Sequence, residues 1–294
     1  MKIKKLSNLE IKPPEKESGL YKTPDDLPKA HQVCIVVGKR NSGKSTSAVN
    51  LIEKMNYDYT IAVSPTMGSN KELMERLNIK HVIEDVDDPS VVNQIKKVIE
   101  DEATALDRYK EELKQYNAFL KKLQSGELIA DEELLRYFEN DSFIKPVHEF
   151  NGRPPMIAVV VDDCIGSQLY SKPRKLNNLS TLSRHVGALA EGGAVGCSLF
   201  FLIQAFKCQV GGLNKVIRGQ ATSMIIFKTQ NSTELKDIAE SVSGEIGEDQ
   251  FYKVYNFAVQ EPYDFLFIDL HRKPNHPSPF RKRFDTFIIP QELE

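Results

Sequence analysis

One stretch of the sequence combines glycines, a lysine and hydroxyl side chains at the spacing that phosphate groups require. Residues 38–45 read Gly-Lys-Arg-Asn-Ser-Gly-Lys-Ser, the pattern G-x-x-x-x-G-K-S. Glycines let the backbone curl so that successive N–H groups point inward and hold an anion. Lys44 is expected to reach the β- and γ-phosphates, and the Ser45 hydroxyl to ligate Mg²⁺. The pattern predicts a site for ATP and Mg²⁺ formed by Gly38, Lys39, Arg40, Asn41, Ser42, Gly43, Lys44, Ser45 and Thr46.

The flanks of this stretch have the character that a phosphate-binding loop needs. Residues 33–37 are continuously apolar, and residues 46–52 carry helix formers with apolar side chains at the spacing of one helix face. Strand, glycine-rich turn and helix is the required context, and the N-terminus of the helix adds a partial positive charge. The alternative is a glycine turn with an exposed lysine, and these flanks argue against it.

A pair of carboxylates follows a second apolar run. Residues 157–161 predict a strand buried on both faces, and Asp162 and Asp163 lie at its carboxyl end. Open α/β sheets place their ligands at that edge. Asp162 suits the Mg²⁺ shell, and Asp163 suits polarising the attacking water. An isolated pair of this kind often marks only a turn, but downstream of a phosphate loop it is the expected partner.

A polar amide ends a third apolar run. Residues 198–203 predict another fully buried strand, and Gln204 follows it directly. If this strand lies next to the aspartate strand, the Gln204 side chain is expected to face the γ-phosphate and to orient water. A glutamine at the end of a strand would mean little by itself.

The elements around these residues alternate between strand and helix patterns. Further strands are expected at 59–63, 222–227 and 265–268, and helices near 70–77, 232–242 and 249–259. Alternating units of this kind predict an α/β fold with a mostly parallel sheet and helices on both faces.

Three segments depart from that alternation. Residues 1–30 are polar and proline-bearing and predict an extended arm, either a disordered lead or a strap onto a neighbouring subunit. Residues 88–141 predict a helical insertion in the domain that spans 31–294. Its long amphipathic helix has an apolar heptad stripe and ends at Ser125-Gly126, and a second helix at 131–138 folds back on it. The stripe either packs on its own domain or contacts a partner. Residues 271–294 predict a basic tail that is solvated or contacts phosphates or an adjacent subunit.

Composition limits the function classes. The chain has 294 residues and a net charge of −2, so contact with nucleic acid requires local basic patches. The four cysteines lack disulfide or metal spacing and are expected to be buried thiols of a reducing compartment: Cys34, Cys164, Cys197 and Cys208. The longest apolar run, at 194–203, is too short to span a bilayer, and no signal peptide opens the sequence. We expect a soluble intracellular protein with no membrane contact.

With these residues in place, the chain resembles the FtsK–HerA superfamily of DNA-pumping ATPases, in particular the DNA-packaging ATPases of poxviruses, related large DNA viruses and virophage-like elements. The resemblance covers residues 31 to about 270 apart from the insertion. It rests on the phosphate loop, the Asp162-Asp163 strand, the Arg184-His185 step, and Gly196 leading into the strand that ends in Gln204.

The resemblance implies a RecA-like core acting in a ring of five or six copies around double-stranded DNA, with ATP sites at the subunit interfaces. It also implies capsid or portal proteins as partners, and the host cytoplasm or the virion as the location. Many relatives have Glu where this chain has Asp163. In the cellular motors an arginine thought to act across the interface matches Gly193, so Arg184 and Arg218 are the candidates for that role here.

Two other functions remain open from the sequence. A small-molecule kinase would need an arginine-rich lid, and the insertion has few arginines. A nucleotide-dependent switch is favoured by Asp163-Cys164-Ile165-Gly166, which matches the D-x-x-G pattern of GTPases, but no guanine-reading N/T-K-x-D segment follows.

Overall fold

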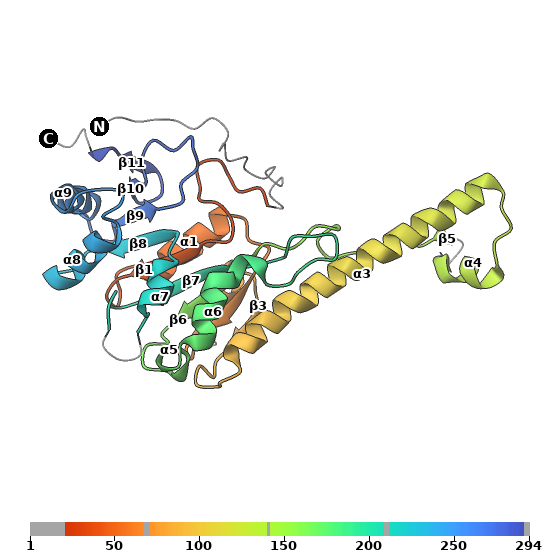
Figure 1. Cartoon of the computed structure of the whole chain (residues 1–294), viewed down its shortest axis with the longest axis horizontal. Coiled ribbons are helices and arrows are strands. Elements are labelled where there is room, and N and C mark those ends of the chain that lie inside the picture. Colours follow the sequence, from red (N-terminus) through yellow and green to blue (C-terminus); the bar gives the residue numbers. More distant parts are fainter. Residues whose placement is uncertain (1–20, 68–70, 140–141, 209–211, 291–294) are drawn as a thin grey trace, which may run out of the picture.

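A nine-stranded sheet forms the centre of the molecule (Figure 1). The computed structural model describes residues 21–67, 71–139, 142–208 and 212–290. From one edge the strand order is β3-β2-β6-β7-β1-β8-β9-β10-β11. The first six run parallel: β3 (Ile79–Ile83), β2 (Tyr59–Val63), β6 (Ile157–Asp162), β7 (Ser198–Ile203), β1 (Val33–Val37) and β8 (Ser223–Phe227). The last three pair antiparallel: β9 (Phe265–Asp269), β10 (Phe280–Lys282) and β11 (Thr286–Ile288).

Apolar cores cover both faces of this sheet, as continuous apolar runs require. Alternate residues of one strand divide between them, so that Ile35 joins the core beneath one set of helices and Val36 the core beneath the other. One face is covered by α1 (Lys44–Lys54). The core on the other face includes residues of α3 (Val91–Ser125), α5 (Gln168–Ser171), α6 (Arg174–Leu182), α7 (Lys215–Gly219), α8 (Ser232–Ser241) and α9 (Glu248–Ala258). The predicted α/β class, with helices on both faces, is confirmed.

The predicted elements of the core match the structure closely. The strands expected at 33–37, 59–63 and 198–203 have those bounds, and the other predicted elements differ by a few residues at their ends. A helix α2 (Lys71–Arg76) lies within the range expected near 70–77. The sequence reading missed β3, α5, α6, α7 and a 3₁₀ turn at Ser183–His185, which are short or carry no clear periodicity.

The insertion is built on one long helix that leaves the core. Helix α3 has 35 residues, which corresponds to roughly 52 Å. Its first half packs on the sheet through Ile95, Ile99 and Leu106, and its second half projects away (Figure 1). The helix ends where predicted, because Gly126 adopts the left-handed conformation (φ 72°) that terminates helices.

The projecting half carries a small core of its own. Tyr116 and Phe119 pack against Tyr137 of α4 (Asp131–Tyr137), which is followed by the short strands β4 (Phe138–Glu139) and β5 (Ser142–Phe143). The predicted heptad stripe, which included Leu113 but neither Ala103 nor Phe119, is wrong in detail: Ala103 and Phe119 are buried, whereas Leu113 is only half-buried. A straight helix repeats every 3.6 residues, so a heptad stripe drifts by about 20° per repeat.

The two ends of the described chain pack together. The prediction of a solvated basic tail is wrong for residues 271–290, because β10 and β11 extend the sheet and Arg281 is fully buried. The Arg281 guanidinium donates to the carbonyl oxygens of Asp26 and Phe284. Lys273 donates to the carbonyl oxygen of Pro24, so residues 21–30 lie against this hairpin as an extended segment. The rest of the predicted arm, residues 1–20, lies outside the described residues.

The structure bears on two expectations from composition, one about the cysteines and one about membrane-spanning helices. Cys34, Cys164 and Cys197 are buried as expected, but Cys208 is exposed, which corrects the prediction of four buried thiols. Within the described ranges, no helix combines the length and the apolar character that crossing a bilayer requires.

Candidate functional site

The loop after β1 has the backbone that an anion site needs. Asn41 and Gly43 adopt positive φ angles of 61° and 100°, which turn successive N–H groups toward the inside of the loop. Gly38 has no space for a side chain, since a Cβ there would lie 2.5 Å from Ser42 Oγ. Gly43 is the N-cap of α1 and offers no side-chain cap, and the first turn of the helix has no acidic residue. The N-terminus of α1 is thus available to an external anion.

Lys44 lies over this loop, half-buried. Its Nζ donates a hydrogen bond to the Lys39 carbonyl oxygen at 3.0 Å. Burial lowers the pKa of Lys44, while the nearby Asp162 and Asp163 oppose that change. A partly desolvated ammonium held over the loop is placed to meet a phosphate group.

The loop and the aspartate strand meet through side chains. Ser45 Oγ lies 3.4 Å from Asp162 Oδ2, and the Asp163 backbone N–H donates to Asp162 Oδ1 at 2.9 Å. Burial, and then the charge of Asp163, raises the pKa of Asp162 to about 6. The structure therefore brings together the two residues that the sequence assigned to Mg²⁺.

The oxygen donors at this point fit magnesium bound together with a nucleotide. Magnesium takes oxygen ligands, and it usually combines one or two protein ligands with phosphate oxygens and water. Ser45 and Asp162 supply such a pair. In the described part of the chain, no group of three or more His, Cys, Asp or Glu side chains is arranged to hold a metal ion. The site fits a metal that arrives with phosphate groups.

Asp163 is exposed and adopts a left-handed backbone conformation, with φ 52°. Such a conformation is unfavourable for a residue other than glycine and is often found at functional sites. Its carboxylate oxygen Oδ2 accepts a hydrogen bond from Thr66 Oγ1 at 3.3 Å. Sequence reasoning missed Thr66, although its place just beyond the carboxyl end of β2 was a usable signal.

Gln204 reaches the same edge because β7 lies between β1 and β6. The Gly38 N–H donates to the Ile203 carbonyl oxygen at 3.1 Å, so the residue after Ile203 begins beside the loop. Gln204, Gly38 and Lys39 share the wall of a cavity of about 120 Å³. A strand between the loop strand and the aspartate strand, ending in a polar side chain, completes the RecA-like arrangement. The chain has a RecA-like P-loop NTPase fold.

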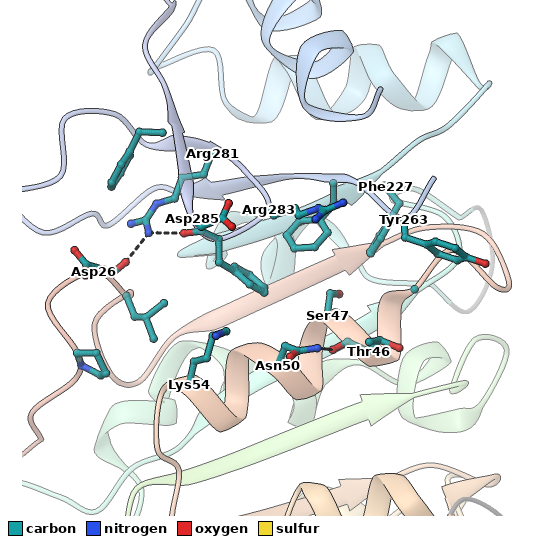
Figure 2. A pocket seen from close by; sticks show the side chains of 16 residues that line it. Asp26, Thr46, Ser47, Asn50, Lys54, Phe227, Tyr263, Arg281, Arg283 and Asp285 are labelled. Atoms are coloured by element: carbon teal, nitrogen blue, oxygen red, sulfur yellow. Dashed lines mark hydrogen bonds between the residues drawn. The ribbon is translucent and has the colours of Figure 1, made fainter. Parts of the chain in front are cut away.

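A larger pocket of about 1100 Å³ opens along α1, from Gly43 to Lys54 (Figure 2). Gly43, Thr46 and Asn50 form one wall, and aromatic side chains dominate the other: Phe227, Tyr263, Phe265, Phe284 and Phe287. Arg283 lies at this pocket with its Nε 2.6 Å from Oδ1 of the buried Asp264. An apolar, aromatic pocket next to a phosphate loop suits a nucleotide base and its ribose. None of its aromatic residues was predicted from the sequence.

The two candidate arginines have different environments. Arg218, in α7, donates to the carbonyl oxygens of Leu213 (2.6 Å) and Phe206 (3.3 Å), which is a structural role. Arg184 is exposed and precedes β7, so it lies at the amino edge of the parallel strands, opposite the phosphate loop. A five-residue strand separates these edges by roughly 16 Å. Arg184 therefore lies too far from the phosphate loop of its own chain to contact a nucleotide there.

Arg184 lines a second pocket, of about 1070 Å³, together with Lys29, His31 and His185. Its Nε donates to His185 Nε2 at 3.1 Å, and this bond does not use the terminal nitrogens of the guanidinium. The glycine-rich segment behind it is fastened to α3, because Lys110 pairs with Glu191 at 2.6 Å. A firmly held segment thus presents Arg184 at this edge.

No family model matches the sequence, and no curated protein matches it. Solved structures are similar to the chain at low identity. The genome packaging NTPase B204 from Sulfolobus turreted icosahedral virus 2, in complex with AMP, has a TM-score of 0.45 and 13% identity, over 87% of this chain and 98% of that one. The pCW3 conjugation coupling protein TcpA has a TM-score of 0.42 and 17% identity, over 90% and 64% of the two chains. EssC (ATPases 2 and 3) from Geobacillus thermodenitrificans has a TM-score of 0.38 and 14% identity, over 87% of this chain and 38% of that one. Because these TM-scores and identities are low, the fold assignment rests on the strand order of the sheet and on the phosphate-binding loop.

Proposed function

We propose that this chain is an ATPase that couples ATP hydrolysis to the movement of double-stranded DNA. The observation that carries the ATPase assignment is the contact between Ser45 and Asp162 beneath the uncapped N-terminus of α1. It joins a phosphate-binding loop to a partly buried carboxylate, and hydrolysis of a nucleoside triphosphate requires both.

Each side chain of the site has a role that follows from its position. The loop N–H groups and Lys44 hold the β- and γ-phosphates, and the pocket along α1 takes the base and ribose. Ser45 and Asp162 hold Mg²⁺, which when bound neutralises charge that develops on the phosphate oxygens. Asp163, exposed at the same edge, polarises the attacking water, and Gln204 orients that water beside the loop.

The movement of DNA is supported by the FtsK–HerA resemblance of the sequence. In this proposal the chain works as a ring of five or six copies, and Arg184 acts on the nucleotide of the neighbouring subunit. What supports Arg184 is its exposure at the edge opposite its own loop, whereas Arg218 is engaged by two carbonyl oxygens. Packaging of a viral genome, with capsid or portal partners in the host cytoplasm or the virion, is the finer form of the same proposal.

ATP hydrolysis measured with and without duplex DNA tests this function. We expect turnover that rises when DNA is added and disappears in Lys44→Ala, because the variant lacks the cation that meets the phosphates. Lys97→Ala, an exposed lysine on α3, is the matched control and should keep full turnover. Unchanged hydrolysis in Lys44→Ala would refute the site. ATP turnover that responds to a small acceptor molecule would favour the small-molecule kinase. Very slow turnover would favour the nucleotide-dependent switch.

A further inference from the structure

The Thr66 hydroxyl lies beside Asp163, and the Ser64 hydroxyl lies beside Thr66, although nearly a hundred residues of sequence separate both from Asp163. Strands β2 and β6 pair in parallel with Val63 opposite Val161. The residues that follow each strand, Ser64 to Thr66 and Asp162 to Cys164, therefore emerge side by side at the carboxyl edge. The Cys164 thiol lies between them, 3.2 Å from the Asp162 carbonyl oxygen and 3.6 Å from the Val63 carbonyl oxygen.

Hydrogen bonds connect the side chains of Ser64, Thr66 and Asp163, and the donor of each can be assigned. Thr66 Oγ1 donates a hydrogen bond to Asp163 Oδ2 at 3.3 Å. The Ser64 hydroxyl accepts from the Thr66 backbone N–H at 3.3 Å and lies 3.2 Å from Thr66 Oγ1. Since the Thr66 proton is already directed to Asp163, the Ser64 proton points to Thr66. The chain of donation runs from Ser64 through Thr66 to Asp163.

Ser64, the first donor in this series of hydrogen bonds, is held rigidly. Ser64 is fully buried, and its backbone N–H donates to the Ile83 carbonyl oxygen at 3.0 Å. The backbone of Asp163 is held as well, because its N–H donates to Asp162 Oδ1. What remains to be fixed is the rotation of the Asp163 carboxylate about its last side-chain bond, which has only a broad, weak preference of its own. A hydrogen bond to one carboxylate oxygen fixes the direction of the other.

We propose that Thr66 is a positioning residue for hydrolysis: it holds Oδ2 of Asp163 so that Oδ1 faces the attacking water. This inference rests on the proposed role of Asp163 and goes beyond it, since it assigns a function to the segment that follows β2. In this scheme Thr66 acts on the reaction through Asp163.

The test compares three variants of strand β2 and the segment after it. Thr66→Val removes the hydroxyl and keeps the shape, and we expect kcat to fall about tenfold, the effect of losing one hydrogen bond to a charged group. The dissociation constant for a non-hydrolysable ATP analogue should stay within about twofold of the wild-type value. Thr66→Ser restores the donor and should recover most of the rate. Thr60→Val is the control: this buried threonine has an unpaired hydroxyl, and its removal should leave kcat unchanged.

A double variant separates positioning from a structural role. In Asp163→Asn the carboxylate is already gone, so adding Thr66→Val should lower kcat no further. Equal losses in both backgrounds, an unchanged kcat in Thr66→Val, or an increase would each overturn the proposal. A fall in kcat that Thr66→Ser does not recover would also overturn it. These results are distinct from a failure of the proposed function, in which the wild-type protein and Lys44→Ala would show the same ATP turnover.

Discussion

Asp162→Asn is expected to stabilise the nucleotide-free protein at neutral pH while it removes a ligand from the site. Burial and the neighbouring Asp163 raise the pKa of Asp162 from 3.8 to about 6. At pH 7 the carboxyl is therefore ionised at a cost to the folded state. Asparagine has the same shape and no charge, and its oxygen can still accept the hydrogen bond from the Asp163 N–H.

The size of the effect follows from the two pKa values. Each pH unit between them corresponds to roughly 1.4 kcal/mol, which gives about 3 kcal/mol at pH 7. Because Asp162 is not completely buried, solvent screens part of this, and we expect about 2 kcal/mol. The folded protein binds the proton more tightly than the unfolded chain does, so the wild type loses this stability as pH rises from about 4 through about 6.

Urea unfolding of both proteins without metal or nucleotide measures this difference. The free energies of unfolding should agree near pH 4, and the variant should be the more stable protein at pH 7. All other titrating groups are common to both proteins and cancel in the comparison. Mg²⁺-dependent nucleotide binding should be weaker in the variant at pH 7. A difference in stability that does not change with pH, or a wild type that is more stable at pH 7, would refute the reasoning.

Three further predictions concern the chemistry and the assembly. Asp163→Asn should bind ATP with Mg²⁺ normally and hydrolyse it slowly; normal turnover would show that another carboxylate polarises the water. Arg184→Ala mixed with Lys44→Ala, each inactive alone, should recover ATPase activity when subunits exchange, because one mixed interface joins an intact loop to an intact arginine. Recovery with Arg218→Ala in place of Arg184→Ala would contradict that choice. Binding to duplex DNA should be independent of base sequence and weaken steeply with salt, as counterion release requires; a flat salt response would argue against it.

The sequence by itself determined the parts of the site that are contiguous. The loop from Gly38 to Ser45 was predicted with its ligand class, because its glycines and its lysine act through a backbone turn that neighbouring residues make together. The strands β1, β2 and β7 were predicted with their bounds, because a short, predominantly apolar run is best accommodated inside a sheet covered on both faces.

The tertiary structure decided which of these pieces meet. The sequence places Thr66 just beyond the carboxyl end of β2, but it does not pair Thr66 with Asp163, 97 residues away; the parallel pairing of β2 with β6 brings them within 3.3 Å. The burial of Arg281 was equally hidden, since a basic, proline-broken segment resembles a solvated tail. Its guanidinium is accommodated only because the hairpin places it against two carbonyl oxygens and 4.2 Å from the centre of the Phe287 ring. A buried charge needs partners, and partners distant in sequence become known only once strand order and register are set.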